Sequence, residues 1–179
     1  MLRKEILISG FGGQGVVMAG RILGYAAVLA GLRATMLVSH GTETRGGYVR
    51  SQVVVSDDLI DSPTVERPDI FCALSQAAYG RFLGLMGDGV ILYDPGFVTP
   101  NRLQDAAHFA VPARALAVEK VGNELSANIV VLGVILRKLG LIPLEQGLQA
   151  VREIIPRSVE INLRALEIGC QLALELGEL

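Results

Sequence analysis

The first segment with residue types suited to chemistry is the glycine-rich run Gly10-Phe11-Gly12-Gly13-Gln14-Gly15. It has the spacing Gly-x-Gly-x-x-Gly and lies between an apolar run and a helix-like segment, where dinucleotide-binding proteins carry their phosphate turn. Glycines let the backbone approach a phosphate, and a helix N-terminus favours an anion. The second predicted strand, however, ends in Val38-Ser39-His40 instead of the acidic residue that binds a ribose. The run therefore fits a tight turn packed against another backbone better than an NAD site.

A second segment is the charged loop His40-Gly41-Thr42-Glu43-Thr44-Arg45-Gly46-Gly47, which follows the end of that strand. Open α/β sheets place their sites at the carboxyl ends of strands. Arg45, next to Gly46 and Gly47, would present a fixed guanidinium to a carboxylate or a phosphate. Glu43 would orient it. A solvated turn with glycines for the reversal explains the same residues equally well, so the loop alone leaves both interpretations open.

A third segment, Gly87-Asp88-Gly89, imitates the start of a thiamine diphosphate motif. That motif continues with paired asparagines, whereas here only the single Asn101 and Asn123 follow. Magnesium held through a diphosphate requires several oxygen ligands in octahedral geometry. Asp88 alone does not supply them, so we interpret the segment as a turn before a strand.

The remaining reactive side chains do not group together. Cys72 and Cys170 lie far apart in apolar surroundings without a Cys-x-x-Cys pair, which excludes ferredoxin-type cluster ligation and zinc-ribbon sites. His40 and His108 have no neighbours that suggest a triad. Asn128 is unusual because it lies in an apolar helical segment. A buried amide needs hydrogen-bond partners, so we expect it to brace a loop.

The elements that position these residues alternate between strand and helix. We predict strands over residues 4–9, 33–39, 48–56, 70–74, 89–93 and 109–111, and helices over 15–30, 76–85, 128–139, 143–154 and 159–176. Ser75 and Ser126 are expected to cap two of the helices. This order predicts an α/β fold, a Rossmann-like, mostly parallel sheet with helices on both faces, in one domain over residues 1–179.

Composition limits the partners. A net charge of -2 and a pI near 5.7 argue against nucleic acid and anionic membranes. Hydrophobic residues make up 51% and charged residues only 19%, against about 25% in typical soluble domains. No uncharged run approaches the roughly 20 apolar residues of a membrane span. We therefore expect a cytoplasmic protein whose surplus apolar surface forms a subunit interface.

Several of these segments together resemble a known family. Gly10 to Val16, followed by Gly20-Arg21-Ile22-Leu23, is similar to the opening of the gamma subunit, or fused gamma domain, of 2-oxoacid:ferredoxin oxidoreductases. Ser39 to Gly47 resembles the family's Gly-Pro-Glu-x-Arg-Gly-Gly loop, with Thr42 where the family usually has Pro. Asn128-x-x-x-Leu132-Gly133 and Asn162-x-x-Ala165-x-x-x-Gly169 follow in the expected order. The resemblance spans nearly the whole chain and is strongest to the 2-oxoglutarate member.

The resemblance implies a role in oxidative decarboxylation of a 2-oxo acid, with the acyl group passed to coenzyme A and electrons to ferredoxin. Thiamine diphosphate, magnesium and iron–sulfur clusters are then expected on partner alpha, beta and delta (ferredoxin-type) subunits, with no catalytic, metal or cofactor residue in this chain alone. The implied interface or cofactor-facing residues are Gly12, Gly13, Gln14, Gly15, Glu43, Arg45, Gly46, Gly47 and Asn128. Isolated chains are expected to form homodimers.

The choice of 2-oxo acid stays open between 2-oxoglutarate, pyruvate and branched-chain acids, because the substrate pocket would lie on another subunit. A stand-alone Rossmann-like nucleotide-binding or regulatory protein is the alternative from a different class. Binding of NAD(H) or NADP(H) by the isolated chain would favour that alternative.

Overall fold

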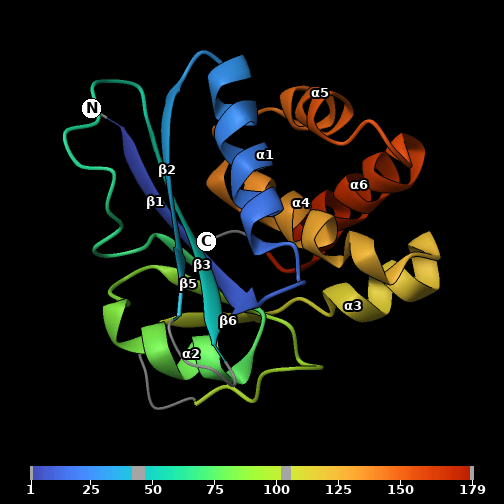
Figure 1. Cartoon of the computed structure of the whole chain (residues 1–179), viewed down its shortest axis with the longest axis horizontal. Helices are drawn as coiled ribbons and strands as arrows, with labels where there is room; N and C mark the ends of the chain where they lie inside the picture. Colours follow the sequence, from blue (N-terminus) through green and yellow to red (C-terminus); the bar gives the residue numbers. More distant parts are fainter. Residues whose placement is uncertain (1, 42–46, 102–105, 178–179) are drawn as a thin grey trace.

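A computed structural model describes residues 2–41, 47–101 and 106–177 (Figure 1). Its centre is a six-stranded sheet in the order β2-β3-β1-β4-β5-β6. The strands are β1 (Arg3–Phe11), β2 (Arg33–His40), β3 (Tyr48–Ser56), β4 (Ile70–Ala73), β5 (Val90–Tyr93) and β6 (Ala107–Ala110). The α-helices are α1 (Val16–Leu29), α2 (Gln76–Phe82), α3 (Ala113–Leu116), α4 (Ala127–Leu139), α5 (Leu144–Ile154) and α6 (Val159–Glu175). The predicted α/β class is confirmed.

Strand direction follows the prediction with one exception. β1, β4, β5 and β6 pair in parallel, whereas β3 is antiparallel to both of its neighbours, β1 and β2. β1 and β2 therefore run the same way but are separated by β3. The sheet is mostly parallel, as predicted. The connection from β1 through α1 to β2 passes over the antiparallel strand β3, which lies between them.

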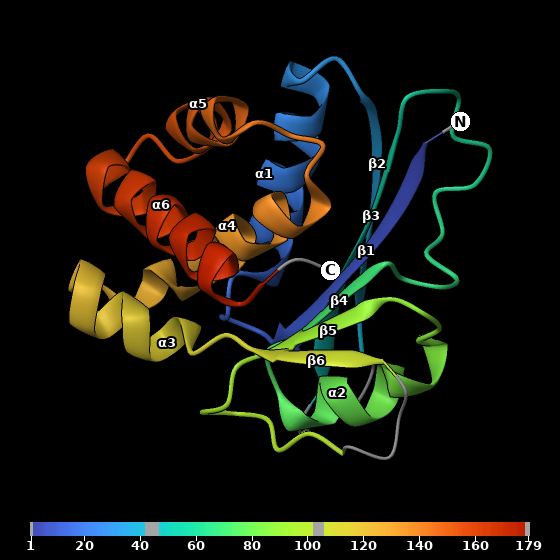
Figure 2. The same ribbon diagram turned by 180° about the vertical axis from the view of Figure 1, so that it is seen from behind.

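Helices cover the two faces of the sheet unequally. α1, α4, α5 and α6 lie on one face and α2 lies on the other, as the two opposite views show (Figures 1 and 2). We call these the α1 face and the α2 face. Side chains alternate between them along β1, because Ile6 and Ile8 belong to the core on the α1 face and Leu7 to the smaller core on the α2 face. Helices therefore cover both faces, as predicted.

Two glycines set the distance between α4 and α6. A Cβ on Gly169 would overlap the carbonyl oxygen of Val130, and a Cβ on Gly133 would overlap that of Leu166. The helix backbones can approach this closely only because both positions lack a side chain. The crossing carries the largest helix–helix contact of the α1 face and fixes the position of α4 over the sheet.

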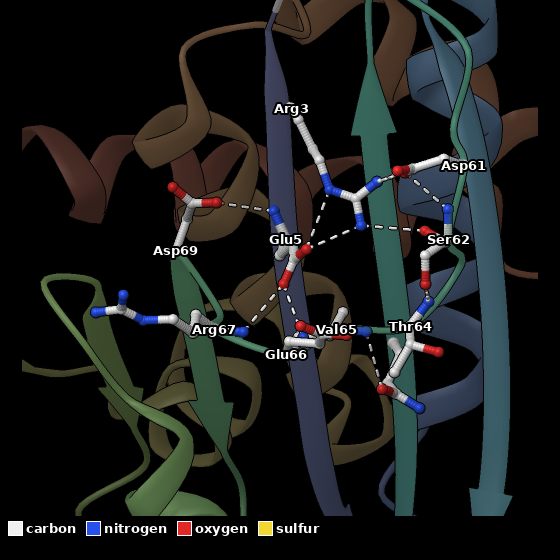
Figure 3. A network of polar contacts seen from close by, with 10 residues as sticks. Arg3, Glu5, Asp61, Ser62, Thr64, Val65, Glu66, Arg67 and Asp69 are labelled. Carbon is white, nitrogen blue, oxygen red and sulfur yellow. Dashed lines mark hydrogen bonds and ion pairs between the residues drawn. The ribbon is translucent and has the colours of Figure 1, made fainter.

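A carboxylate at the start of β1 fastens the connection between β3 and β4 (Figure 3). Glu5 Oε2 accepts hydrogen bonds from the backbone N–H groups of Glu66, at 2.8 Å, and Arg67, at 3.1 Å. Its Oε1 accepts from Arg3 Nη2 at 2.9 Å. This cluster lies at the edge of the sheet where the parallel strands begin, and we interpret it as structural.

The predicted helix caps are half right. The Ser75 hydroxyl accepts a hydrogen bond from the Ala78 N–H at 3.2 Å, which confirms the first cap. Ser126 occupies the N-cap position of α4 but makes no side-chain cap, so that prediction is wrong. Its hydroxyl instead donates to Asn162 Oδ1 at 3.1 Å, because α6 brings a buried amide acceptor within reach. None of the described helices is long and apolar enough to cross a membrane.

We predict that Gly169→Ala lowers the free energy of unfolding by about 1–3 kcal/mol, because the added methyl group forces α4 and α6 apart. Gly80→Ala is the matched control, since Gly80 lies in α2 with open space where its Cβ would be. That change is expected to stabilise by up to about 1 kcal/mol through helix propensity. Urea unfolding measures both, and equal effects of the two substitutions would contradict the tight crossing.

Candidate functional site

The site candidate lies at the edge of the sheet where β1, β4, β5 and β6 end, which we call the carboxyl edge. The chain leaves β1 for α1 on one face and leaves β4 for α2 on the other (Figures 1 and 2). The crevice between β1 and β4 is thus a topological switch point, the position at which open α/β sheets bind their ligands.

The side chain of Gln14 fills this crevice. Its Oε1 accepts a hydrogen bond from the Phe11 N–H at 2.6 Å, and its Nε2 donates to the carbonyl oxygen of Leu74 at 2.8 Å. Gly10 makes room for it, because a Cβ there would overlap the Gln14 carboxamide. The carboxamide therefore bridges the ends of β1 and β4, and the donor that Phe11 would offer to a ligand is used internally.

Two glycines of the following turn, Gly13 and Gly15, are required by the local structure. Gly13 and Gly15 have φ angles of 91° and 73°, which disfavour any other residue. A Cβ on Gly15 would also overlap Asn128, whose Nδ2 donates to Gly15 O at 3.2 Å. This contact confirms that Asn128 braces a loop. Gly12 differs, because it is exposed, has no left-handed φ and has open space around its Cβ position. Neither the backbone conformation nor a contact with the described residues requires a glycine at position 12.

A cavity of about 120 Å³ opens beside the Gln14 bridge. Its apolar wall includes Leu74, Phe97 and Leu125, and its polar rim includes Gln14 and Asn128. Sites for drug-sized ligands typically occupy about 300–1,000 Å³. This cavity is too small for a dinucleotide, and it fits a protruding side chain or the narrow end of a larger molecule.

The far wall of the cavity is held by Asp94, a buried carboxylate after β5. Its Oδ1 accepts from the Gly96 N–H at 2.9 Å and its Oδ2 from the Arg114 N–H at 3.0 Å. Asp94 thus ties the turn after β5 to the start of α3. Its only signal in the sequence is an Asp-Pro-Gly turn.

Arg114 covers the outer side of this wall. Its Nε lies 2.6 Å from Glu124 Oε1, and its guanidinium lies 5.6 Å from the centroid of the Phe97 ring. Both partners of the ion pair are more than half exposed, so the pair contributes little to stability. This wall, which α3 and the 3-10 turn over Glu124–Ser126 supply, was not predicted from the sequence.

Neither cysteine is suited to act as a nucleophile. Burial raises the pKa of the Cys72 thiol far above its usual range, with the Asp94 charge as a second cause. Burial likewise raises the pKa of Cys170 to about 11. His108 is held between Tyr79 and a backbone carbonyl, with its Nε2 at 2.8 Å from the Tyr79 hydroxyl oxygen and its Nδ1 at 2.8 Å from Ala106 O. Within the described residues no group of three or more His, Cys, Asp or Glu is arranged to hold a metal ion.

Some predicted site residues come together, and others cannot be compared. Gly12, Gly13, Gln14, Gly15 and Asn128 meet at the carboxyl edge. Gly47 directly precedes β3 and so lies at the same edge. Glu43, Arg45 and Gly46 lie outside the described residues.

The strand order bears on the nucleotide alternative. In the dinucleotide fold the second strand lies next to the first, and its end carries the ribose-binding acid. Here β3 separates β1 from β2, so His40 at the end of β2 is two strands away from the glycine turn. Together with the Gln14 bridge and the small cavity, this arrangement does not favour a dinucleotide site.

Comparison with known proteins identifies the family of the chain. Residues 5–172 match the family described as pyruvate ferredoxin/flavodoxin oxidoreductase. The chain belongs to this family.

The chain is also similar to individual proteins of known name or structure. The chain is 39% identical to the 2-oxoglutarate synthase subunit KorC of Methanothermobacter marburgensis, over 97% of this chain and 98% of that protein. It is 34% identical to the gamma subunit of a keto/oxoacid ferredoxin oxidoreductase from Geobacter sulfurreducens, with a TM-score of 0.85 over 96% of this chain and 99% of that one. The 2-oxoglutarate:ferredoxin oxidoreductase from Magnetococcus marinus shares the fold, with a TM-score of 0.88 and 24% identity, over all of this chain and 32% of that one.

We predict that Gln14→Ala lowers the free energy of unfolding by about 1–3 kcal/mol, because Phe11 N–H and Leu74 O both lose their partner. Amide exchange at Phe11 should accelerate. Gln149→Ala is the control, because the Gln149 side chain donates to Glu153 on the exposed side of α5, where such pairs are worth about 0.2–0.5 kcal/mol. Hydrogen exchange and urea unfolding measure the difference, and unchanged exchange at Phe11 would show that Gln14 does not close the crevice.

Proposed function

We propose that this chain is the gamma subunit of a 2-oxoglutarate:ferredoxin oxidoreductase, a single domain over residues 1–179 that works only inside the complex. The observation that carries the proposal is the similarity to KorC over nearly the full length of both proteins. The reaction joins decarboxylation of the 2-oxo acid to acylation of coenzyme A, and the two electrons released pass to ferredoxin. The proposed location is the cytoplasm.

The cofactors of this reaction belong on the partner subunits in our proposal. Thiamine diphosphate and magnesium would lie on the alpha and beta subunits and iron–sulfur clusters on a ferredoxin-type delta subunit. The support from this chain is chemical. Its thiols are shielded by burial, its described acids and histidines form no metal site, and its switch point is filled by Gln14.

The carboxyl edge is the proposed face toward the thiamine-carrying subunits and coenzyme A. Phe11, Phe97 and Leu125 are exposed at this edge by 39%, 37% and 81%. Permanent interfaces are enriched in such apolar groups, and a few anchors seated in pockets supply most of the binding energy. Gly12 has free space above it for a partner's backbone or an anion. Glu43, Arg45, Gly46 and Gly47 are proposed to contact the same partner, with Arg45 on a carboxylate or phosphate.

The function is tested by producing the chain together with its partner subunits and following ferredoxin reduction with coenzyme A and different 2-oxo acids. We expect a higher kcat/KM for 2-oxoglutarate than for pyruvate or a branched-chain 2-oxo acid. The isolated chain should be colourless and inactive, because it lacks the ligands for clusters and thiamine. Tight binding of NAD(H) by the isolated chain, without assembly, would support the nucleotide-binding alternative instead.

The proposed interface has a sharper test in Leu125→Glu. We expect this change to weaken assembly with the partner subunits by about tenfold or more, since the loss of a hot-spot residue costs about 2 kcal/mol or more and about 1.4 kcal/mol is tenfold. The melting temperature of the isolated chain should hardly change because Leu125 is 81% exposed. Leu59→Glu is the matched control, as Leu59 is 72% exposed in the connection after β3, at the opposite edge of the sheet. Equal losses from both variants, measured by co-purification, would argue against the carboxyl edge.

A further inference from the structure

β2 forms one edge of the sheet, and its outer side pairs with none of the described segments. It is eight residues long and keeps an unbroken register with β3 from Arg33 to His40. Natural edge strands are usually protected by a proline, a charged side chain, a bulge or a short length. β2 has no proline and no bulge, its one charged residue, Arg33, lies at its first position, and Leu37 and Val38 are exposed on it by 37% and 41%. Such an edge is a template for another strand.

The register defines which backbone groups are available. The Gly41 N–H donates to Tyr48 O at 2.7 Å, and the register places these two residues opposite each other, so Gly41 lies at a hydrogen-bonded position of the ladder. Hydrogen-bonded and non-hydrogen-bonded pairs alternate along an antiparallel ladder. The odd-numbered residues of β2 therefore direct their backbone N–H and C=O groups toward β3. The even-numbered residues, Ala34, Met36, Val38 and His40, therefore turn their N–H and C=O groups outward.

These outward groups are self-complementary about a two-fold axis. With the axis through Leu37, an antiparallel second copy places Met36 opposite Val38 and Ala34 opposite His40. All four open residues then lie in hydrogen-bonded pairs, whereas an axis through Met36 leaves the groups of His40 outside the strand pairing. Leu37 meets its own copy on the α2 face. Arg33, the one residue of β2 charged at neutral pH, faces the neutral Gly41 of the other copy and not another cation.

A groove continues the apolar surface onto the α1 face. It has a volume of about 500 Å³ and lies between α1 and β2, lined among others by Gly20, Gly24, Val28 and Met36. Val28 is 52% exposed. Tyr25 and Glu153 also line it, and the Tyr25 hydroxyl donates to Glu153, which ties α1 to α5. A second copy paired along β2 brings Val38 and its own α1 to this groove.

We propose that two copies of this chain pair antiparallel along β2, with the two-fold axis at Leu37, and form one continuous sheet across the dimer. The occupant of the edge is thus a second copy. The pairing involves only this chain and does not depend on the proposed enzymatic function.

Analytical ultracentrifugation of the purified full chain tests the pairing. We expect a reversible dimer for the unchanged chain. Leu37→Lys should raise the dimer Kd by about tenfold or more, because it removes the Leu–Leu contact and sets two like charges opposite each other. Leu59→Lys is the matched control at another exposed leucine. A chain that stays monomeric throughout the micromolar range, or a dimer that Leu37→Lys leaves unchanged, would overturn the proposal.

Cross-linking gives a readout that does not depend on charge. In a Cys170→Ala background, Leu37→Cys should form an intermolecular disulfide under mild oxidation, since directly opposite residues have Cβ atoms about 4.5–5.5 Å apart. Thr35→Cys should not, because the two copies of residue 35 lie four positions apart along the strands, or about 13 Å. Efficient cross-linking through residue 35 but not 37 would refute the register. If the chain is monomeric and Leu37→Lys abolishes binding of the partner subunits instead, the edge takes a partner's strand, and the proposal fails.

Discussion

The reversed strand β3, inserted between β1 and β2, is the constraint on which most of this structure depends. It pairs with nine residues of β1 on one side and with eight residues of β2 on the other, and so sets the alignment of both strands. The insertion moves the end of β2 away from the glycine turn and leaves β2 as an edge. It also makes β4 the parallel neighbour of β1, which creates the crevice that Gln14 closes. A strand direction thus decides where ligands and partners can approach.

The helical layer determines the geometry of the site through close backbone contacts. Gly133 and Gly169 let α4 settle against α6, and the start of α4 then carries Asn128 to the glycine turn. Ser126, two residues earlier, is held by Asn162 of α6. The two family-like segments that begin at Asn128 and Asn162 therefore belong to one structural unit. Gly133 and Gly169 set the distance between α4 and α6, while Asn128 contacts the backbone of the glycine turn and Asn162 contacts the Ser126 side chain.

Much of the fold could be read from the sequence because hydrophobic runs and turn residues encode it locally. The predicted strands and long helices agree with the structure to within a few residues, and the bracing role of Asn128 followed from burial of an amide. Strand direction could not be read, because alternation along β3 is the same in either orientation. The partners of Gln14 and Ser126 were hidden for another reason. Leu74 is 60 residues from Gln14, and Asn162 is 36 from Ser126, so only the folded chain brings them together.

The distribution of apolar surface explains why a chain with few charges suits an assembly. Leu125 and Phe97 project near the ends of β4 and β5, whereas Leu37 and Val38 lie on the β2 edge, across β1 and β3 in the sheet. Neighbouring strands are about 4.8 Å apart, so β2 and β4 are separated by about 14 Å. Contacts at the carboxyl edge and along β2 can therefore form at the same time. In the proposed arrangement the carboxyl edge faces the partner subunits, and the β2 edge joins two copies of the chain through backbone hydrogen bonds.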